Sequence, residues 1–211
     1  LVGSEMCIRD RNNILSFNVE SESELVKLEE VAREMDAIAP VAIRFTPGVD
    51  AGEHEFIKTG RTSDKFGVSI DQAMQLTEKC LQNKNLKIVG LTCHIGSQIT
   101  ELEKFKEAAT QSLKLLLDVE KLGANLDFID MGGGLGVTYL DEKTIQPYEL
   151  IQCYEEIFQG RPERLIVEPG RSISANAGIL LTKVEYKKNN FLITDAAMND
   201  LLRPALYQAQ H

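Results

Sequence analysis

Apolar and polar positions follow two alternating rhythms along most of the chain. Short apolar runs occupy residues 14–19, 41–45, 86–94, 126–131 and 165–167, and each has the length of a buried strand. Between them, apolar residues recur every three or four positions, which is the spacing of one helical face. The first such segment carries Leu25, Leu28, Val31, Ala32 and Met35. Nearly continuous apolar strands separated by helices are typical of a parallel sheet covered by helices, so the pattern predicts the α/β class.

Capping signals indicate where the predicted helices begin and end. The expected N-terminal caps are Ser21 with Glu24, Ser69, and Thr100 with Glu103. A serine or threonine followed three residues later by glutamate has the spacing of a capping box. Pro147 suits the first position of a further helix, whereas Gly123 and Gly160 are expected to end helices. Helices are therefore predicted after four of the apolar runs or short strands.

The alternation stops after Arg171. Apolar runs at 179–186 and 191–194 are separated only by a turn at 187–190, which predicts an antiparallel hairpin. A polar loop at 49–64 and a short strand at 65–68 are expected earlier in the chain. We therefore expect three regions: a non-native or disordered leader at 1–13, an incomplete barrel of parallel strands at 14–178, and the start of a C-terminal β domain at 179–211.

Composition narrows the classes of partner. The net charge of -9 over 211 residues argues against a nucleic acid or an anionic membrane surface as partner. No apolar run approaches the roughly 20 residues of a membrane span. The four cysteines are scattered without a C-x-x-C pair, which favours free thiols in a reducing cytoplasm. The three histidines lie too far apart in sequence to suggest a metal site.

Polar motifs follow three of the predicted strands, at 94–98, 132–136 and 168–171. In a parallel barrel these strand ends share one face, where sites form. Glu168 ends the apolar run at 165–167, and an acid in that place is costly unless it has a partner. Arg171 follows after a proline and a glycine, and its guanidinium suits a phosphate or a carboxylate. The alternative for this segment alone is a surface turn with a solvated charge pair.

The other two motifs carry groups that suit a planar, phosphorylated ligand. The glycines Gly132, Gly133 and Gly134 allow backbone N–H groups to approach a phosphate closely, although a plain flexible turn has the same composition. Ser97 could donate its hydroxyl to the same phosphate, or be an ordinary turn serine. His94 could place its ring against a cofactor, or be a hydrogen-bonded core residue.

The segment 195–207 adds a second guanidinium and a phenol. Arg203 and Tyr207 lie four residues apart and could bind a substrate that carries a carboxylate. The alternative is an amphipathic segment with a solvated arginine.

As a set, these residues resemble the diaminopimelate decarboxylase family of pyridoxal phosphate (PLP) enzymes. The matching segments are 17–21, 54–57, 65–67, 94–98, 132–136, 168–172 and 195–207. The wider group, with the ornithine and arginine decarboxylases, has an alanine-racemase-like (β/α)8 TIM barrel followed by a β domain. The resemblance therefore implies a partial barrel of this PLP-binding type, followed by the start of a β domain.

The resemblance also implies a role for each matching residue. The implied cofactor site consists of His94, Ser97, Gly132, Gly133, Gly134, Glu168, Pro169, Gly170 and Arg171. In this family His94 would stack on the cofactor ring, and Glu168 would keep the pyridine nitrogen protonated so that the ring accepts electrons. Arg171 would lie between the phosphate and the substrate carboxylate, with Arg203 and Tyr207 at the distal end of the substrate. The implied reaction is decarboxylation of meso-2,6-diaminopimelate to L-lysine and CO2, the last step of lysine biosynthesis.

Two parts of the family pattern are missing from the sequence. No lysine stands in the motif of the lysine that carries the cofactor, and no cysteine matches that of the later β domain. Five or six barrel strands are predicted rather than eight. We therefore expect an internal fragment that is poorly stable and inactive alone, within a full-length homodimer.

Three other functions stay open at this point. An enzyme for another basic amino acid (ornithine, arginine or carboxynorspermidine) is the nearest, although Arg203 and Tyr207 favour a substrate with a second carboxylate. A non-catalytic homologue is disfavoured by the presence of Glu168 and Arg171 together with the glycine run. A phosphate-binding barrel without PLP would need another partner for Glu168.

Overall fold

The computed structural model describes residues 14–49, 66–207 and 210. The expected leader at 1–13, the motif at 54–57 and Lys65 lie outside these residues. Five parallel strands form one sheet in chain order: β1 (Phe17–Val19), β2 (Ala39–Arg44), β3 (Leu86–Thr92), β4 (Phe128–Asp130) and β5 (Arg164–Ile166). Four helices accompany them: α2 (Glu22–Glu34), α3 (Ile70–Leu81), α4 (Leu102–Lys121) and α5 (Pro147–Ile157).

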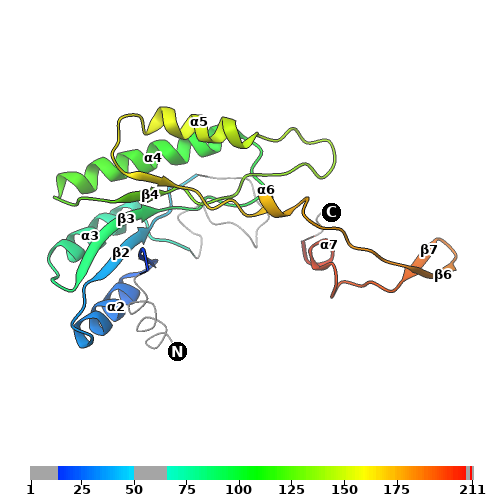
Figure 1. Cartoon of the computed structure of the whole chain (residues 1–211), viewed down its shortest axis with the longest axis horizontal. Coiled ribbons are helices and arrows are strands. Elements are labelled where there is room, and N and C mark those ends of the chain that lie inside the picture. The colour runs from blue at the N-terminus through cyan, green and yellow to red at the C-terminus, as the bar shows by residue number, and fades with distance from the viewer. Residues whose placement is uncertain (1–13, 50–65, 208–209, 211) are drawn as a thin grey trace.

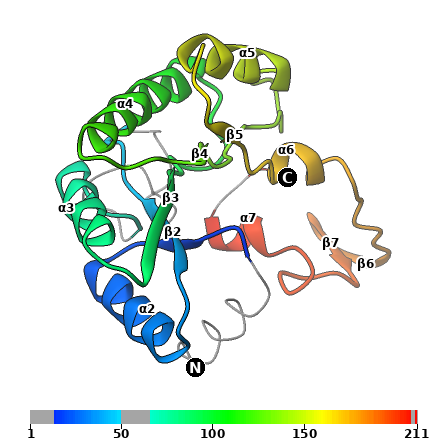
Figure 2. The same ribbon diagram turned by 60° about the vertical axis from the view of Figure 1, so that its left-hand side comes forward.

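The sheet is curved, and the helices α2 to α5 lie along its outer side (Figure 2). Every neighbouring pair of strands is parallel. The α/β class and the partial barrel are thereby confirmed. The division of the chain at residues 13 and 178 stays a prediction.

The hydrophobic core fills the space between the sheet and these helices. Val41 and Ile43 of β2 are fully buried there, as are Phe105 of α4 and Tyr154 of α5. Because side chains alternate along a strand, the next residues in line face the inner side of the curved sheet. Burying a large apolar side chain contributes about 1.5–3 kcal/mol, so this layer fixes the strands and their ends.

Two of the three predicted caps are present. Ser69 and Gln72 form a reciprocal capping box at the start of α3. The Ser21 hydroxyl accepts from the Glu24 amide at 3.1 Å, while the Glu24 carboxylate accepts from the Glu20 amide instead of completing the box. Gly123, at φ +96°, follows α4 as expected.

The capping box predicted for Thr100 and Glu103 is wrong. Helix α4 begins at Leu102, and its cap residue Glu101 makes no side-chain cap bond. Ile99 forms a parallel bridge with Leu135, with its amide bonded to Gly134 at 2.9 Å. This bridge keeps the chain extended past Thr100, so the helix starts later than the residue types suggest.

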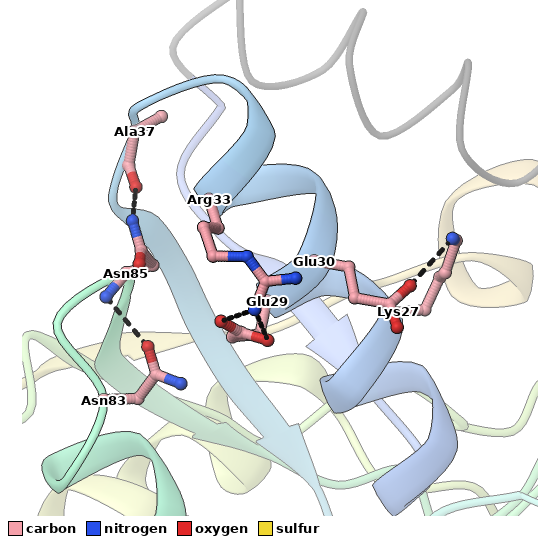
Figure 3. A network of polar contacts seen from close by, with 7 residues as sticks. All are labelled: Lys27, Glu29, Glu30, Arg33, Ala37, Asn83 and Asn85. Atoms are coloured by element: carbon pink, nitrogen blue, oxygen red, sulfur yellow. Dashed lines mark hydrogen bonds and ion pairs between the residues drawn. The ribbon is translucent and has the colours of Figure 1, made fainter.

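At the opposite end of the sheet, away from the polar motifs, two asparagines make hydrogen bonds within and between neighbouring loops (Figure 3). The Asn85 side chain donates to the Ala37 carbonyl at 3.0 Å, and its backbone amide donates to the Asn83 side chain at 2.9 Å. On the outer surface of α2, Lys27 pairs with Glu30. Exposed ion pairs of this kind contribute about 0–1 kcal/mol to the free energy of unfolding. The buried Asn85 therefore does more to hold this end of the sheet together.

The chain after β5 has a different character (Figure 1). It holds two short helices, α6 (Arg171–Ser174) and α7 (Leu202–Tyr207), and an antiparallel hairpin of β6 (Val184–Lys188) and β7 (Phe191–Thr194). The predicted hairpin is confirmed, but its first strand begins at 184 instead of 179, and it continues through the turn predicted to start at 187. Strand β7 is only four residues long, so it offers no pairing partners to 179–183.

Candidate active site

The register of the strands determines which side chains share the inner face at their carboxyl ends. One row of Cα partners crosses the sheet through Arg44, Thr92, Asp130 and Ile166. Two residues further along each strand direction stand His94, Gly132 and Glu168. Because alternation repeats every two residues, these positions follow the same inner face. The three polar motifs predicted from the sequence therefore meet at one end of the sheet.

Asp130 is a buried acid in the middle of this end. Its Oδ1 atom accepts from the Gly132 amide at 2.8 Å, and its carboxyl group shares a hydrogen bond with that of Glu168. Burial raises the pKa of Asp130 to about 6, the Gly132 amide opposes this rise, and the nearby charge of Glu168 adds to it. Asp130 is buried while Glu168 is exposed, so burial acts mainly on the Asp130 carboxyl group.

His94 lies against the glycine run. Its Nδ1 atom accepts from the Gly133 amide at 3.2 Å, which places the ring proton on Nε2. Burial lowers the pKa of His94, and the positive charge of Arg44 lowers it further, against the opposing effect of Glu168. The ring is therefore neutral at pH 7 and presents an uncharged aromatic surface.

The glycine run allows the three segments to pack closely. A Cβ atom on Gly133 would lie 2.2 Å from the Glu168 carbonyl oxygen, and one on Gly134 would lie 2.2 Å from that of Gly96. Real Cβ contacts do not approach so closely, so these positions require glycine. The amides of Gly132 and Gly133 already donate to Asp130 and His94. If these two amides bind a phosphate, they must exchange those internal partners for phosphate oxygens.

Arg171 is fixed at the start of α6 by Gln98. Its Nη1 atom donates to Gln98 Oε1 at 3.0 Å, and the same oxygen accepts from the Val137 amide at 3.1 Å. The Gln98 amide nitrogen also donates to the Val137 carbonyl. Gln98 has a φ of +61°, a strained region for a residue with a side chain. These contacts hold it there and connect the loop after the glycine run to Arg171.

Arg203 reaches the same place from α7. Its Nη1 atom donates to the Tyr139 hydroxyl at 2.9 Å, and its guanidinium carbon lies 5.2 Å from the centre of the Tyr139 ring. The guanidinium carbon of Arg171 lies 6.0 Å from the same ring centre. Both distances are within the range of cation–π attraction.

A pocket of about 700 Å³ opens between these groups. Its polar lining includes Ser97, Tyr139, Arg171, Ser174, Asp200 and Arg203. This volume falls in the range of about 300–1,000 Å³ that is usual for small-molecule sites. Two guanidinium groups and two hydroxyl-bearing serines make the pocket suited to anionic oxygen atoms.

The structure brings most of the predicted site residues together. Ser97, Gly170, Arg171 and Arg203 all line the pocket. His94, the glycine run and Glu168 form the neighbouring strand ends, with Pro169 exposed between Glu168 and Gly170. Tyr207 stands in the last turn of α7, four residues after Arg203, so the two residues share a helical face. Among the described residues that line the pocket, Tyr207 is absent. Their roles toward ligands stay predictions.

Sequence reasoning missed Asp130, Gln98 and Tyr139. Asp130 ends an apolar strand just as Glu168 does, so the same signal could have identified it. Gln98 belongs to the polar turn at 94–98, but nothing in its residue type indicates a bond to Arg171. Tyr139 lies in a polar loop, and no local pattern distinguishes it.

Among the residues that the structure describes, no three histidine, cysteine, aspartate or glutamate side chains gather closely enough to hold a metal ion. No helix among the same residues has the length and apolar character needed to cross a membrane.

Known proteins are similar in sequence to this chain. A family model described as the pyridoxal binding domain of pyridoxal-dependent decarboxylases matches residues 4–175. The diaminopimelate decarboxylase of Haemophilus influenzae is 47% identical over 201 residues, which are 93% of this chain and 48% of the relative. That of Pseudomonas aeruginosa is 47% identical over 197 residues, 92% of this chain and 48% of the relative. The chain spans about half the length of the curated relatives it matches.

Solved structures share the fold. Diaminopimelate decarboxylase from Helicobacter pylori, complexed with L-lysine, matches with a TM-score of 0.96 and 41% identity, over 99% of this chain and 54% of that one. The M. jannaschii enzyme in complex with L-lysine matches with a TM-score of 0.89 and 34% identity, over 99% of this chain and 51% of that one. These matches extend through the strand ends and the segment after β5.

Proposed function

The chain belongs to the pyridoxal-dependent decarboxylases, and we propose that it forms the cofactor and substrate site of an enzyme that converts meso-2,6-diaminopimelate to L-lysine and CO2. One observation carries the proposal most directly. An acid, a neutral histidine and two arginines converge at the carboxyl ends of parallel strands, beside a pocket of sufficient volume. Lysine-bound structures of similar proteins support the same substrate class.

The residues present fit PLP. The cofactor is a planar ring with a basic nitrogen at one side and a phosphate at another. Glu168 presents an exposed carboxylate, His94 an uncharged ring, and Arg171 a guanidinium held by Gln98. The glycine run lets the loop carrying Gly96 and the strand end at Glu168 pack together, where any Cβ would collide with backbone. When bound, PLP supplies an electron-accepting ring that stabilises the charge left by departing CO2.

The chain's own residues have distinct roles in this proposal. Glu168 accepts a hydrogen bond from the protonated ring nitrogen and so maintains that proton. Asp130 lies buried beside Glu168 and shares a hydrogen bond with its carboxyl group, which fixes the position of the Glu168 side chain. His94 would pack on one face of the ring. Ser97 and Gly170 would hold the phosphate, and Arg171 would lie between the phosphate and the substrate carboxylate. Arg203 with Tyr207 would bind the distal end of the substrate.

The two arginines favour a dicarboxylic substrate over ornithine or arginine. Arg171 and Arg203 flank one aromatic ring, so the pocket carries two positive groups near each other. A substrate whose distal end is an amine or guanidinium would meet like charge there, at a cost in affinity. A distal carboxylate is attracted by the same groups.

We further propose that the protein acts in the cytoplasm as a homodimer. The described cysteines Cys80, Cys93 and Cys153 are free and buried, which agrees with a reducing compartment. Apolar side chains such as Ile179 and Leu181 are almost fully exposed on the segment after α6, where a partner surface could cover them. Sedimentation of the complete gene product tests the dimer, and a monomer at micromolar concentration contradicts it.

The experiment that tests the proposed activity compares substrates. The complete gene product, supplied with PLP, is incubated with meso-2,6-diaminopimelate, L-ornithine or L-arginine, and CO2 release is measured. We expect kcat/KM to be at least about 100-fold higher for the dicarboxylic substrate, because ornithine and arginine would leave the charged groups of the site unpaired. Equal or better turnover of ornithine or arginine contradicts the substrate assignment, and no CO2 from any of the three contradicts the activity.

A further inference from the structure

We propose that Tyr139 is a positioning residue that holds Arg171 and Arg203 as a pair for the carboxylate that the substrate keeps through the reaction. The inference rests on the proposed function and names the residue that gives its site selectivity for a distal carboxylate. The Tyr139 hydroxyl accepts from Arg203 at 2.9 Å, and the two guanidinium carbons lie 5.2 and 6.0 Å from its ring centre.

Without such a contact the two guanidinium groups would be expected to move apart. Like charges repel, and each arginine has a long side chain with many rotamers. The electron-rich face of a tyrosine attracts cations, and its hydroxyl adds a directed hydrogen bond to Arg203. Arg171 is half-buried and is held on its other side by Gln98. Tyr139 therefore offsets the repulsion at the place where an anion is to bind.

The loop that carries Tyr139 is itself fixed on both sides. Before it, Val137 is bonded to the Gln98 side chain through both its amide and its carbonyl. After it, one Glu142 oxygen accepts from the amides of Tyr139 and Leu140 at 3.2 and 2.7 Å. The Leu140 amide is the first cause of a lowered pKa at Glu142, so this anchor stays charged at neutral pH. A ring held in this way can impose a position on flexible arginines.

The chemistry of the reaction supplies a test ligand. Decarboxylation removes one carboxylate of the substrate and leaves the other in the product L-lysine. Cadaverine has the same carbon chain and both amines but no carboxylate. The difference between the affinities for L-lysine and cadaverine therefore measures recognition of the retained carboxylate, separately from recognition of the amines.

The experiment uses three variants of the complete gene product. Tyr139→Leu removes the ring and the hydroxyl, whereas Tyr139→Phe removes only the hydroxyl that accepts from Arg203. Tyr148→Leu is the matched control, because Tyr148 lies on α5 and is 69% exposed. For each protein, KM and kcat for meso-2,6-diaminopimelate are measured, and the Kd values for L-lysine and cadaverine are measured by calorimetry.

We expect Tyr139→Leu to raise KM and the L-lysine Kd by about tenfold or more, the loss that accompanies misplaced charge-assisted hydrogen bonds. The kcat should stay within about threefold, and the cadaverine Kd should not change, because neither depends on the paired arginines. Tyr139→Phe should give a smaller rise, about threefold, since the ring remains. The Tyr148→Leu control should match the unmodified protein.

Two results overturn the inference. The first is an unchanged L-lysine Kd in both Tyr139 variants, and the second is an equal weakening of L-lysine and cadaverine. If Tyr139→Leu does not fold, Tyr139→Phe decides alone, and an unchanged L-lysine Kd there is sufficient against it. Failure of the proposed function is distinct, because the unmodified protein would then neither release CO2 nor bind L-lysine, and the inference would fall with it.

Discussion

The parallel sheet with its helices and the segment after Arg171 both contribute groups to one pocket, but they hold those groups differently. Within the described residues, none beyond Tyr154 is buried as a whole residue. In the later segment Ile179 and Leu181 are 94% and 89% exposed. His94, Asp130 and Glu168 are therefore fixed by strands and close backbone packing, whereas Arg203 is fixed by its side-chain contacts to Tyr139.

This contrast separates two tasks. Groups that a backbone ladder holds keep their place to within small distances, which suits a fixed interaction with a cofactor ring. Groups that a side-chain contact holds depend on single residues, which suits the choice of a substrate. Mutations at the strand ends should therefore change chemistry or stability, and those at the Tyr139 contacts should change binding.

The largest effect is expected at the strand end that carries the exposed acid. Glu168→Ala should lower kcat by about 10²–10³, as for other groups that are preorganised to stabilise developing charge. The matched control is Glu103→Ala, because the Glu103 side chain is 80% exposed at the start of α4. Steady-state kinetics of both variants test the role, and near-normal kcat in Glu168→Ala contradicts it.

Close packing at the glycine run predicts the next effect. Gly134 and Gly123 have similar φ values of +102° and +96°, but only Gly134 has a backbone atom within contact distance of its missing Cβ. Gly123→Ala should cost about 1–2 kcal/mol from the left-handed backbone. Gly134→Ala should cost about 1–3 kcal/mol more from the collision. Urea unfolding of both variants measures this difference, and equal losses contradict close packing as the reason for glycine.

The buried acid should give stability a specific dependence on pH. The pKa of Asp130 is raised, so protonation of this side chain stabilises the folded protein. That stabilisation is fully present below the usual pKa of an aspartate and is lost as pH rises through about 6. Asp130→Asn keeps an oxygen for the Gly132 amide and removes the charge. The variant should be more stable than the unmodified protein at pH 8, by up to about 3 kcal/mol.

That advantage of Asp130→Asn should shrink below pH 6 and disappear near pH 4, where both proteins carry an uncharged side chain. Thermal unfolding of the cofactor-free proteins across pH 4–8 measures it. The control is Asp118→Asn, a partly exposed position where the pKa is lowered chiefly by a hydrogen bond from Lys121. A difference between Asp130→Asn and the unmodified protein that does not change with pH contradicts the buried acid pair.

The smallest expected effect compares a real helix cap with a predicted one. Ser69→Ala removes a hydroxyl that accepts from the Gln72 amide and should cost about 1 kcal/mol. Thr100→Ala should cost much less, because Thr100 is not the cap of α4. Urea unfolding distinguishes them, and similar losses would show that Thr100 has a structural role that its contacts do not reveal.

The parallel strands could be predicted from the spacing of apolar residues along the sequence. That His94, the glycine run and Glu168 lie together could also be predicted, because the carboxyl ends of parallel strands share one edge of the sheet. The start of the first hairpin strand could not be predicted. Apolar residues suggest a strand from Ile179, but where pairing begins depends on the length of β7. Contacts that join distant segments were also out of reach. Tyr139 and Arg203 are separated by 64 residues, and only the return of the chain through α7 brings them together.

The most direct test of the account follows the ring nitrogen of bound PLP. The complete gene product is loaded with PLP that carries ¹⁵N in the ring, and the nitrogen chemical shift is recorded by NMR from pH 6 to 9 for the unmodified protein and for Glu168→Gln. The account predicts a protonated nitrogen throughout in the unmodified protein and a neutral nitrogen in the variant. The same protonation state in both proteins would contradict the placement of Glu168 against the cofactor ring.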